Sequence, residues 1–138
     1  MNNHFQFQHL VQFYETDLMG IVHHSNYLRF FEETRVAWAH QKGLVDYQRP
    51  ESASQFAVYE TRVRHLRPCR FGDQLKIDLQ ARREGVRVVF QYRLWTGETL
   101  AALGESIHVP LDKNLKVMRL PDEMKEVLEK EIWTETWL

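Results

Sequence analysis

The sequence predicts an α+β fold in which one long helix packs against one face of an antiparallel sheet. Near the start of the chain, apolar side chains alternate with polar ones, which is typical of a strand. Over residues 27–38 large side chains recur at spacings of three and four, which is typical of a helix. After Pro50 the alternation returns and continues through four further segments, so the order of elements is one strand, one helix and a meander of four strands.

The first strand is expected over residues 5–14, where every second position fits one sheet face: Phe5, Phe7, His9, Val11 and Phe13. The helix follows from the spacing of Tyr27, Phe30, Phe31, Thr34 and Trp38. We expect Ser25 or Asn26 to cap its start and Gly43 to end it in a left-handed conformation.

The four later strands are expected over residues 57–65, 75–82, 88–94 and 100–109, the last one stopped by Pro110. Glu84-Gly85 and Thr96-Gly97-Glu98 are predicted to form the turns between them. Apolar positions in the charged tail predict a short amphipathic helix within residues 121–133.

Composition restricts the classes of protein to which the chain could belong. A length of 138 residues fits one domain, residues 1–138, and a formal net charge of −1 argues against a nucleic-acid binder. The single cysteine, Cys69, excludes an intrachain disulfide framework. Neither a secretory signal nor an apolar run long enough for a membrane span is found, which predicts a cytoplasmic protein.

The loop before the helix is where we expect the chemistry. Asp17 brings a carboxylate close to the helix start, where unpaired N–H groups could stabilise an oxyanion. Gly20 would let a ligand approach the backbone closely. The alternative is that Asp17 only stabilises a turn, as many loop aspartates do.

The segment Phe13-Tyr14-Glu15-Thr16-Asp17-Leu18-Met19-Gly20-Ile21-Val22-His23-His24-Ser25-Asn26-Tyr27, with the acidic pair and Arg35 that follow, resembles the signature of the 4-hydroxybenzoyl-CoA thioesterase family. Pro68, Gly72-Asp73 and Val109-Pro110-Leu111-Asp112 also match the family's layout. The resemblance implies a hotdog fold, a five-stranded antiparallel sheet wrapped around one long helix.

The resemblance also implies roles for individual residues. Asp17 matches the catalytic aspartate, which acts as nucleophile or general base, and His24 matches the position whose backbone N–H polarises the carbonyl. Candidate substrate-binding residues in the same motif are Gly20, His23, Asn26 and Tyr27. A homodimer or homotetramer is implied because such sites form between subunits, and no metal or redox cofactor is implied.

A basic segment is the second candidate binding region. Residues 60–93 carry nine basic and four acidic side chains, which is a net charge of +5. Some of these could bind the phosphates of coenzyme A, and we select Arg62, Arg64, Arg82 and Arg83. The alternative is an ordinary solvated sheet face.

The remaining histidines, serine, cysteine and charged helix residues are expected to have structural roles and not catalytic ones. The seven histidines lack zinc-ligand spacing, and Ser25 lacks a nucleophile elbow. His65 and His108 are expected to be ordinary strand residues, Cys69 a small buried group, and Glu32 and Arg35 an ion pair on the helix.

The sequence therefore predicts a hydrolase of acyl thioesters, with acyl-CoA as the first candidate substrate and acyl carrier protein thioesters as the second. Two alternatives stay open. One is a hotdog hydratase or dehydratase, although the Asp-x-Asn-Pro-x-His pattern of such enzymes is absent. The other is a non-catalytic module that binds acyl thioesters or the acyl carrier protein.

Overall fold

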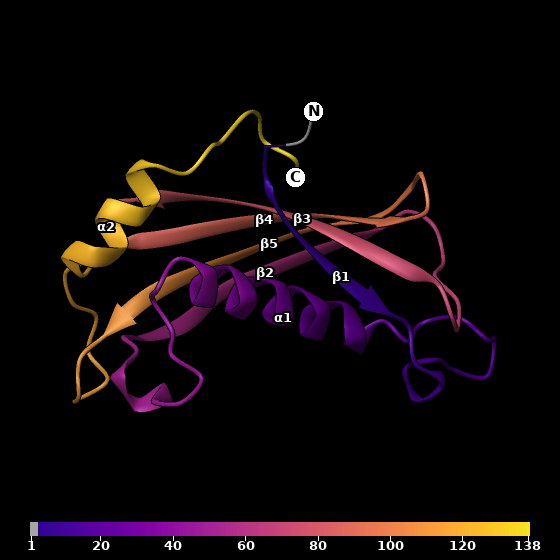
Figure 1. Ribbon diagram of the computed structural model, residues 1–138, viewed down its shortest axis with the longest axis horizontal. Helices are drawn as coiled ribbons and strands as arrows, with labels where there is room; N and C mark the ends of the chain where they lie inside the picture. The colour runs from indigo at the N-terminus through magenta and orange to yellow at the C-terminus, as the bar shows by residue number, and fades with distance from the viewer. Residues whose placement is uncertain (1–2) are drawn as a thin grey trace.

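The computed structural model describes residues 3–138 and shows an antiparallel sheet that curves around one long helix (Figure 1). The strands are β1 (Phe5–Leu10), β2 (Gln55–His65), β3 (Gln74–Glu84), β4 (Arg87–Thr96) and β5 (Thr99–Leu111), in the order β1-β3-β4-β5-β2. The helices are α1 (Ser25–Gln41) and α2 (Asp122–Glu129), with single 3₁₀ turns at η1 (Phe13–Glu15) and η2 (Pro50–Ser52). The predicted α+β architecture is confirmed.

Most strand boundaries lie one or two residues from the predicted ones, and the end of the first strand and the end of the last strand each differ for a specific reason. The first strand ends at Leu10 because Gln12 and Glu15 form a capping box that turns the chain into η1. The last strand continues through Pro110 to Leu111. Pairing between β4 and β5 ends at Val88 and His108, so Pro110 lies where β4 no longer flanks β5.

The start of α1 differs from the prediction, whereas its end agrees with it. The N-cap residue is His24, and neither Ser25 nor Asn26 caps the helix, because both lie inside its first turn. At the other end Gly43 has a φ of +77°, and the Leu44 N–H donates to the carbonyl of Ala39. The predicted glycine stop is therefore confirmed.

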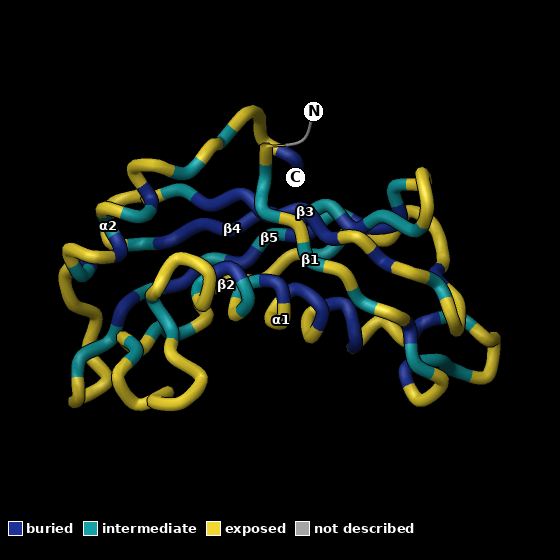
Figure 2. Tube along the Cα trace, in the orientation of Figure 1, coloured by how far each residue is buried: buried dark blue, intermediate teal, exposed yellow. Residues whose placement is uncertain are grey.

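The core lies between α1 and the inner face of the sheet, where the buried stripe of the helix faces buried strand residues (Figure 2). Phe31 stacks on Tyr92 with ring centroids 4.4 Å apart. Gly104 on β5 lies directly under Phe31, and a Cβ atom there would overlap the Phe31 ring. The missing side chain therefore lets α1 pack close to the sheet.

A chain of polar groups crosses this core. Arg35 Nη1 donates to the Tyr92 hydroxyl at 3.2 Å, which lies 2.6 Å from Ser106 Oγ, and Ser106 Oγ lies 2.9 Å from His108 Nε2. The expected ion pair between Glu32 and Arg35 is wrong. Within residues 3–138 the guanidinium of Arg35 has no carboxylate within ion-pair distance.

The C-terminal residues lie across the outer face of the sheet. The Trp137 N–H donates to Gln91 Oε1 at 2.7 Å, and Gln80 Nε2 donates to the carbonyl of Glu135 at 2.7 Å. Both glutamines are buried beneath this segment. Within residues 3–138, no helix combines the length and apolar character needed to cross a membrane.

His108 should make stability depend on pH. Burial, and secondarily the charge of Arg35, lowers the pKa of His108 to about 3. The unfolded chain takes up a proton near pH 6.5 that the folded chain excludes, so stability is lost as pH falls from 6.5 towards 3.

Between pH 6.5 and 5 this group alone should reduce the free energy of unfolding by about 1.5 kcal/mol. Urea unfolding of the wild type and of His108→Gln at both pH values measures the difference. Equal losses of stability in the two proteins would contradict the assignment.

Candidate active site

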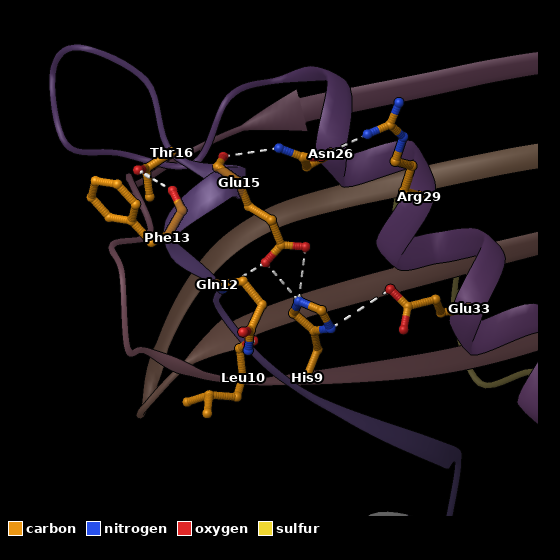
Figure 3. A network of polar contacts seen from close by, with 9 residues as sticks. All are labelled: His9, Leu10, Gln12, Phe13, Glu15, Thr16, Asn26, Arg29 and Glu33. Atoms are coloured by element: carbon orange, nitrogen blue, oxygen red, sulfur yellow. Dashed lines mark hydrogen bonds and ion pairs between the residues drawn. The ribbon is translucent and has the colours of Figure 1, made fainter.

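The carboxylate of Glu15 contacts β1 through His9 and the N-cap of η1 through Gln12, and His9 links it to α1 (Figure 3). Glu15 is 5% exposed. Its Oε1 accepts hydrogen bonds from the Gln12 N–H at 2.7 Å and from His9 Nε2 at 2.9 Å. His9 Nδ1 lies 3.6 Å from Glu33 Oε1, so the histidine ring connects β1 to both η1 and α1. A buried carboxylate is therefore satisfied entirely by neighbouring segments.

The backbone of Glu15 fixes the start of α1. Its carbonyl accepts from the His23 N–H at 2.8 Å and from Asn26 Nδ2 at 2.9 Å. Asn26 is buried by this contact. Its side chain anchors the loop, and a substrate-binding role for Asn26 stays a prediction.

Asp17 opens a tight turn at the tip of this anchored loop. Its backbone carbonyl accepts from the Gly20 N–H at 2.9 Å, and Oδ1 accepts from the Met19 N–H at 2.8 Å. Gly20 adopts a φ of +76°, which favours glycine, so this residue shapes the turn. Within residues 3–138 no hydrogen bond reaches Oδ2 of Asp17. The carboxylate thus stabilises the turn with one oxygen and keeps the other available.

An open cleft of about 450 Å³ lies beside this carboxylate. Its walls include Asp17, His24, Tyr27, His65, Arg67 and Pro68. The structure therefore brings together three of the predicted site residues, Asp17, His24 and Tyr27. Gly20 and His23 do not line the cleft.

His24 presents a free donor at the positive end of α1. The N–H groups of Asn26 and Tyr27 donate to the carbonyls of His23 and His24, and the Ser25 N–H donates to His23 Nδ1 at 3.2 Å. Among residues 3–138, no acceptor is bonded to the His24 N–H. His23 faces Ser25 Oγ at 2.9 Å, which explains its absence from the cleft wall.

Tyr27 and His65 pack against each other in the cleft wall. Tyr27 is 3% exposed, and its ring meets the His65 ring edge-on at 4.6 Å. Burial raises the pKa of Tyr27, whose hydroxyl contacts Cys69, and burial likewise raises the pKa of the Cys69 thiol. Cys69 is therefore a protonated, buried packing group, as predicted.

His65 is the cleft residue that the sequence analysis set aside. Burial, and secondarily the nearby charge of His24, lowers the pKa of His65. The period of two in β2 puts His65 on the same sheet face as Val63, which packs against the core. That alternation was the available signal that His65 faces the helix.

The four selected arginines lie away from the cleft within the chain. Arg62 pairs with Glu105 on the outer sheet face at 2.8 Å, and alternation puts Arg64 on that same face. Arg82 pairs with Glu84, and Arg83 donates to the Gly85 carbonyl, at the far end of β3. Eight residues separate Arg82 from the cleft end of β3, which is about 27 Å of strand. Arg67 is instead the arginine at the cleft wall.

Glu15→Gln should destabilise the protein. The amide keeps the shape but presents a donor where His9 or Gln12 also donates, so one buried polar contact is lost. We expect the free energy of unfolding to fall by about 1–3 kcal/mol in a urea titration. Glu126→Gln, at an exposed position of α2, is the matched control and should be neutral. Equal stabilities of the two variants would contradict the anchoring role.

Comparisons with known proteins identify the family to which the chain belongs. Residues 11–128 match the family model of the Thioesterase-like superfamily. A 1,4-dihydroxy-2-naphthoyl-CoA hydrolase from Nostoc punctiforme is 30% identical over 129 residues, covering 91% of this chain and 86% of that protein.

Solved structures give the same result. A hypothetical protein from Aquifex aeolicus is 30% identical, with a TM-score of 0.83 over 90% of this chain and 98% of that chain. A 1,4-dihydroxy-2-naphthoyl-CoA thioesterase from Synechocystis shares the fold at 19% identity, with a TM-score of 0.82 over 91% of this chain and 96% of that chain. The hotdog fold is confirmed. The family model and the hydrolase relative support thioester hydrolysis in general, and a specificity for 4-hydroxybenzoyl-CoA is not shown. The chain belongs to the Thioesterase-like superfamily.

Proposed function

We propose that the protein hydrolyses acyl-CoA thioesters in the cleft beside Asp17, with Asp17 as nucleophile or general base. One observation carries the proposal: the cleft is lined by Asp17, whose carboxylate has one unbonded oxygen, and by His24, whose backbone N–H is unpaired among residues 3–138 at the start of a 17-residue helix. A thioester carbonyl needs a group that attacks or activates water, and a donor for the oxygen that becomes negative.

In the first step, the thioester oxygen accepts the hydrogen bond of the His24 N–H, where the helix dipole also favours negative charge. Either Oδ2 of Asp17 attacks the acyl carbon, or Asp17 removes a proton from a water molecule that attacks. The tetrahedral oxyanion then collapses and expels the coenzyme A thiolate, which takes a proton from solvent or from the imidazole of His24. In the nucleophilic route, water finally hydrolyses the mixed anhydride.

Arg67 is the basic side chain that best fits a role in coenzyme binding. It is exposed at the cleft wall, and the only hydrogen bond of its guanidinium within residues 3–138 is to the carbonyl of Leu66. A guanidinium in this position can bind a phosphate of coenzyme A while the thioester lies near Asp17.

We further propose that the functional unit is a homodimer, or a homotetramer built from such dimers. Strand β2 ends the sheet and pairs only with β5 among the described strands. Two apolar side chains on it, Val58 and Tyr59, are 55% and 56% exposed. An edge strand of this kind is an aggregation hazard unless something covers it, and a second copy can do so symmetrically.

Asp17→Asn tests the mechanism. Asparagine keeps the Oδ1 acceptor for Met19, so the turn should form, but the attacking charge is lost and kcat should fall by about 10²–10⁴-fold. The matched control is Asp46→Asn, because Asp46 makes the same turn, with the Gln48 N–H on Oδ1 at 2.9 Å, outside the cleft. A thiol-release assay over short, long and aromatic acyl-CoAs measures both variants and defines the acyl preference. A folded Asp17→Asn protein with the parent rate on every substrate would refute the proposal.

A single turnover in ¹⁸O-labelled water detects the nucleophilic route in which water attacks the carboxyl carbon of Asp17 in the mixed anhydride. In that route Asp17 transfers one of its own light oxygens to the product acid and takes up the solvent oxygen itself, whereas a general base, or attack of water on the acyl carbon of the anhydride, puts the solvent oxygen directly into the acid. Mass spectrometry of the released acid distinguishes these results.

Arg67→Gln tests the coenzyme contact. The KM for acyl-CoA should rise about 3- to 10-fold with little change in kcat, because a phosphate contact is the same in the ground and transition states. The corresponding acyl-pantetheine, which lacks the nucleotide phosphates, should be unaffected. Arg83→Gln is the control at the distant end of β3, and an equal rise in KM for that variant would contradict the assignment.

Light scattering tests the assembly. The mass should be an even multiple of 16.6 kDa. Val58→Lys should shift the protein towards monomer, because the symmetric contact would bring two charges together. Val117→Lys, at a comparably exposed valine outside β2, should leave the mass unchanged. An active wild-type monomer would overturn the proposal of a dimer.

A further inference from the structure

A second cavity, of about 140 Å³, lies under the C-terminal half of α1. Aromatic and aliphatic side chains form most of its wall, including Trp38, Phe56, Phe90 and Met124. Arg35 and His108 contribute polar groups from the core, and Glu123 of α2 also lines it. The cavity shares no lining residue with the Asp17 cleft.

The polar chain through the core determines which ring nitrogen of His108 carries the hydrogen. An arginine can only donate, so the Tyr92 oxygen accepts from Arg35 and its own hydrogen is free to point to Ser106. The Ser106 hydroxyl, having accepted from Tyr92, satisfies its hydrogen by donating to His108 Nε2. Neutral His108 therefore carries its hydrogen on Nδ1, which has no partner within residues 3–138.

His108 is 5% exposed and lines the cavity, and its Nδ1 hydrogen has no acceptor among residues 3–138, so this donor is available to a ligand next to an apolar space. Arg35 adds a second set of donors. Its single hydrogen bond among the described residues is to Tyr92, so most of its guanidinium hydrogens are unused. A neutral donor and a cationic donor at one side of an aromatic cavity match a ligand with a paired oxygen acceptor on a flat apolar body.

We propose that this cavity binds a small aromatic carboxylate, with its ring between Trp38, Phe56 and Phe90 and its oxygens on Arg35 and His108 Nδ1. The volume fits one ring, because an apolar protein cavity of about 150 Å³ holds benzene. The carboxylate gains Arg35 as a cationic partner, since no acidic side chain within residues 3–138 forms an ion pair with that guanidinium.

The cavity is a site of its own and not the acyl end of the cleft in the same chain. His24 lies at the cleft, and Trp38 lies at the cavity, 14 residues further along α1. That spacing is about 21 Å of helix. The inference therefore does not depend on hydrolysis at Asp17.

Titration with 4-fluorobenzoate, followed by ¹⁹F NMR on the full chain, tests the proposal. We expect saturable binding with a Kd of about 1 mM or tighter. His108→Phe removes the donor and should weaken binding of 4-fluorobenzoate about tenfold while leaving fluorobenzene unchanged. His40→Phe, at an exposed histidine on the same helix as Arg35, should have no effect.

Two further variants keep the test decisive if His108→Phe fails to fold. Ala53→Phe, at a partly exposed lining position, should fill the cavity and abolish binding of both probes. Glu123→Gln removes a like charge and should tighten binding of 4-fluorobenzoate but not of fluorobenzene.

The Asp17→Asn variant separates this site from the catalytic one. Unchanged binding of 4-fluorobenzoate supports the separate cavity, whether or not hydrolysis is lost. A changed affinity for 4-fluorobenzoate in Asp17→Asn would locate the acid in the cleft beside position 17 and overturn the inference. No saturable binding up to about 10 mM, or equal binding to the wild type and Ala53→Phe, would also overturn it.

Discussion

The position of the candidate active site depends on one buried carboxylate. Glu15 has lost its water shell, and the energetic cost of that loss is offset only if every oxygen finds a donor. The donors come from β1 and from the backbone of η1, while the carbonyl of the same residue receives the start of α1. Three segments must therefore come together before Glu15 can be buried, and the loop that carries Asp17 is fixed as a result.

The long helix then carries different chemistry at its two ends. At its N-terminus, the free N–H of His24 and the helix dipole favour negative charge beside an open cleft. Further along, Arg35 provides a cation that the core tolerates because Tyr92 and Ser106 disperse it through hydrogen bonds. The close approach at Gly104 makes both possible, since it holds the aromatic stripe of the helix against the sheet.

Sequence reasoning predicted what depends on local pattern. Alternation found the strands, the spacing of aromatic residues found α1, and the motif around Asp17 located the cleft. Local pattern could not show which face of the sheet points towards the helix. Arg62 was therefore selected as a binding residue, although it lies on the outer face, where it pairs with Glu105. Sequence reasoning also paired Arg35 with its helix neighbour Glu32, whereas the stronger constraint was a tyrosine 57 residues away. Contacts of this kind depend on tertiary structure, which local pattern does not contain.

The polar chain from Arg35 to His108 has a consequence for how the sequence can vary. Each hydroxyl in it accepts from one neighbour and donates to the next, so the loss of any member leaves a buried hydrogen or lone pair unsatisfied. In a relative with leucine at position 35, the hydroxyl of a tyrosine at position 92 would lose its donor. In a relative with alanine at position 106, the Nε2 of a histidine at position 108 would lose its partner in the same way. Residues 35, 92, 106 and 108 should therefore covary among relatives, which should either keep all four polar side chains or replace them together with apolar ones.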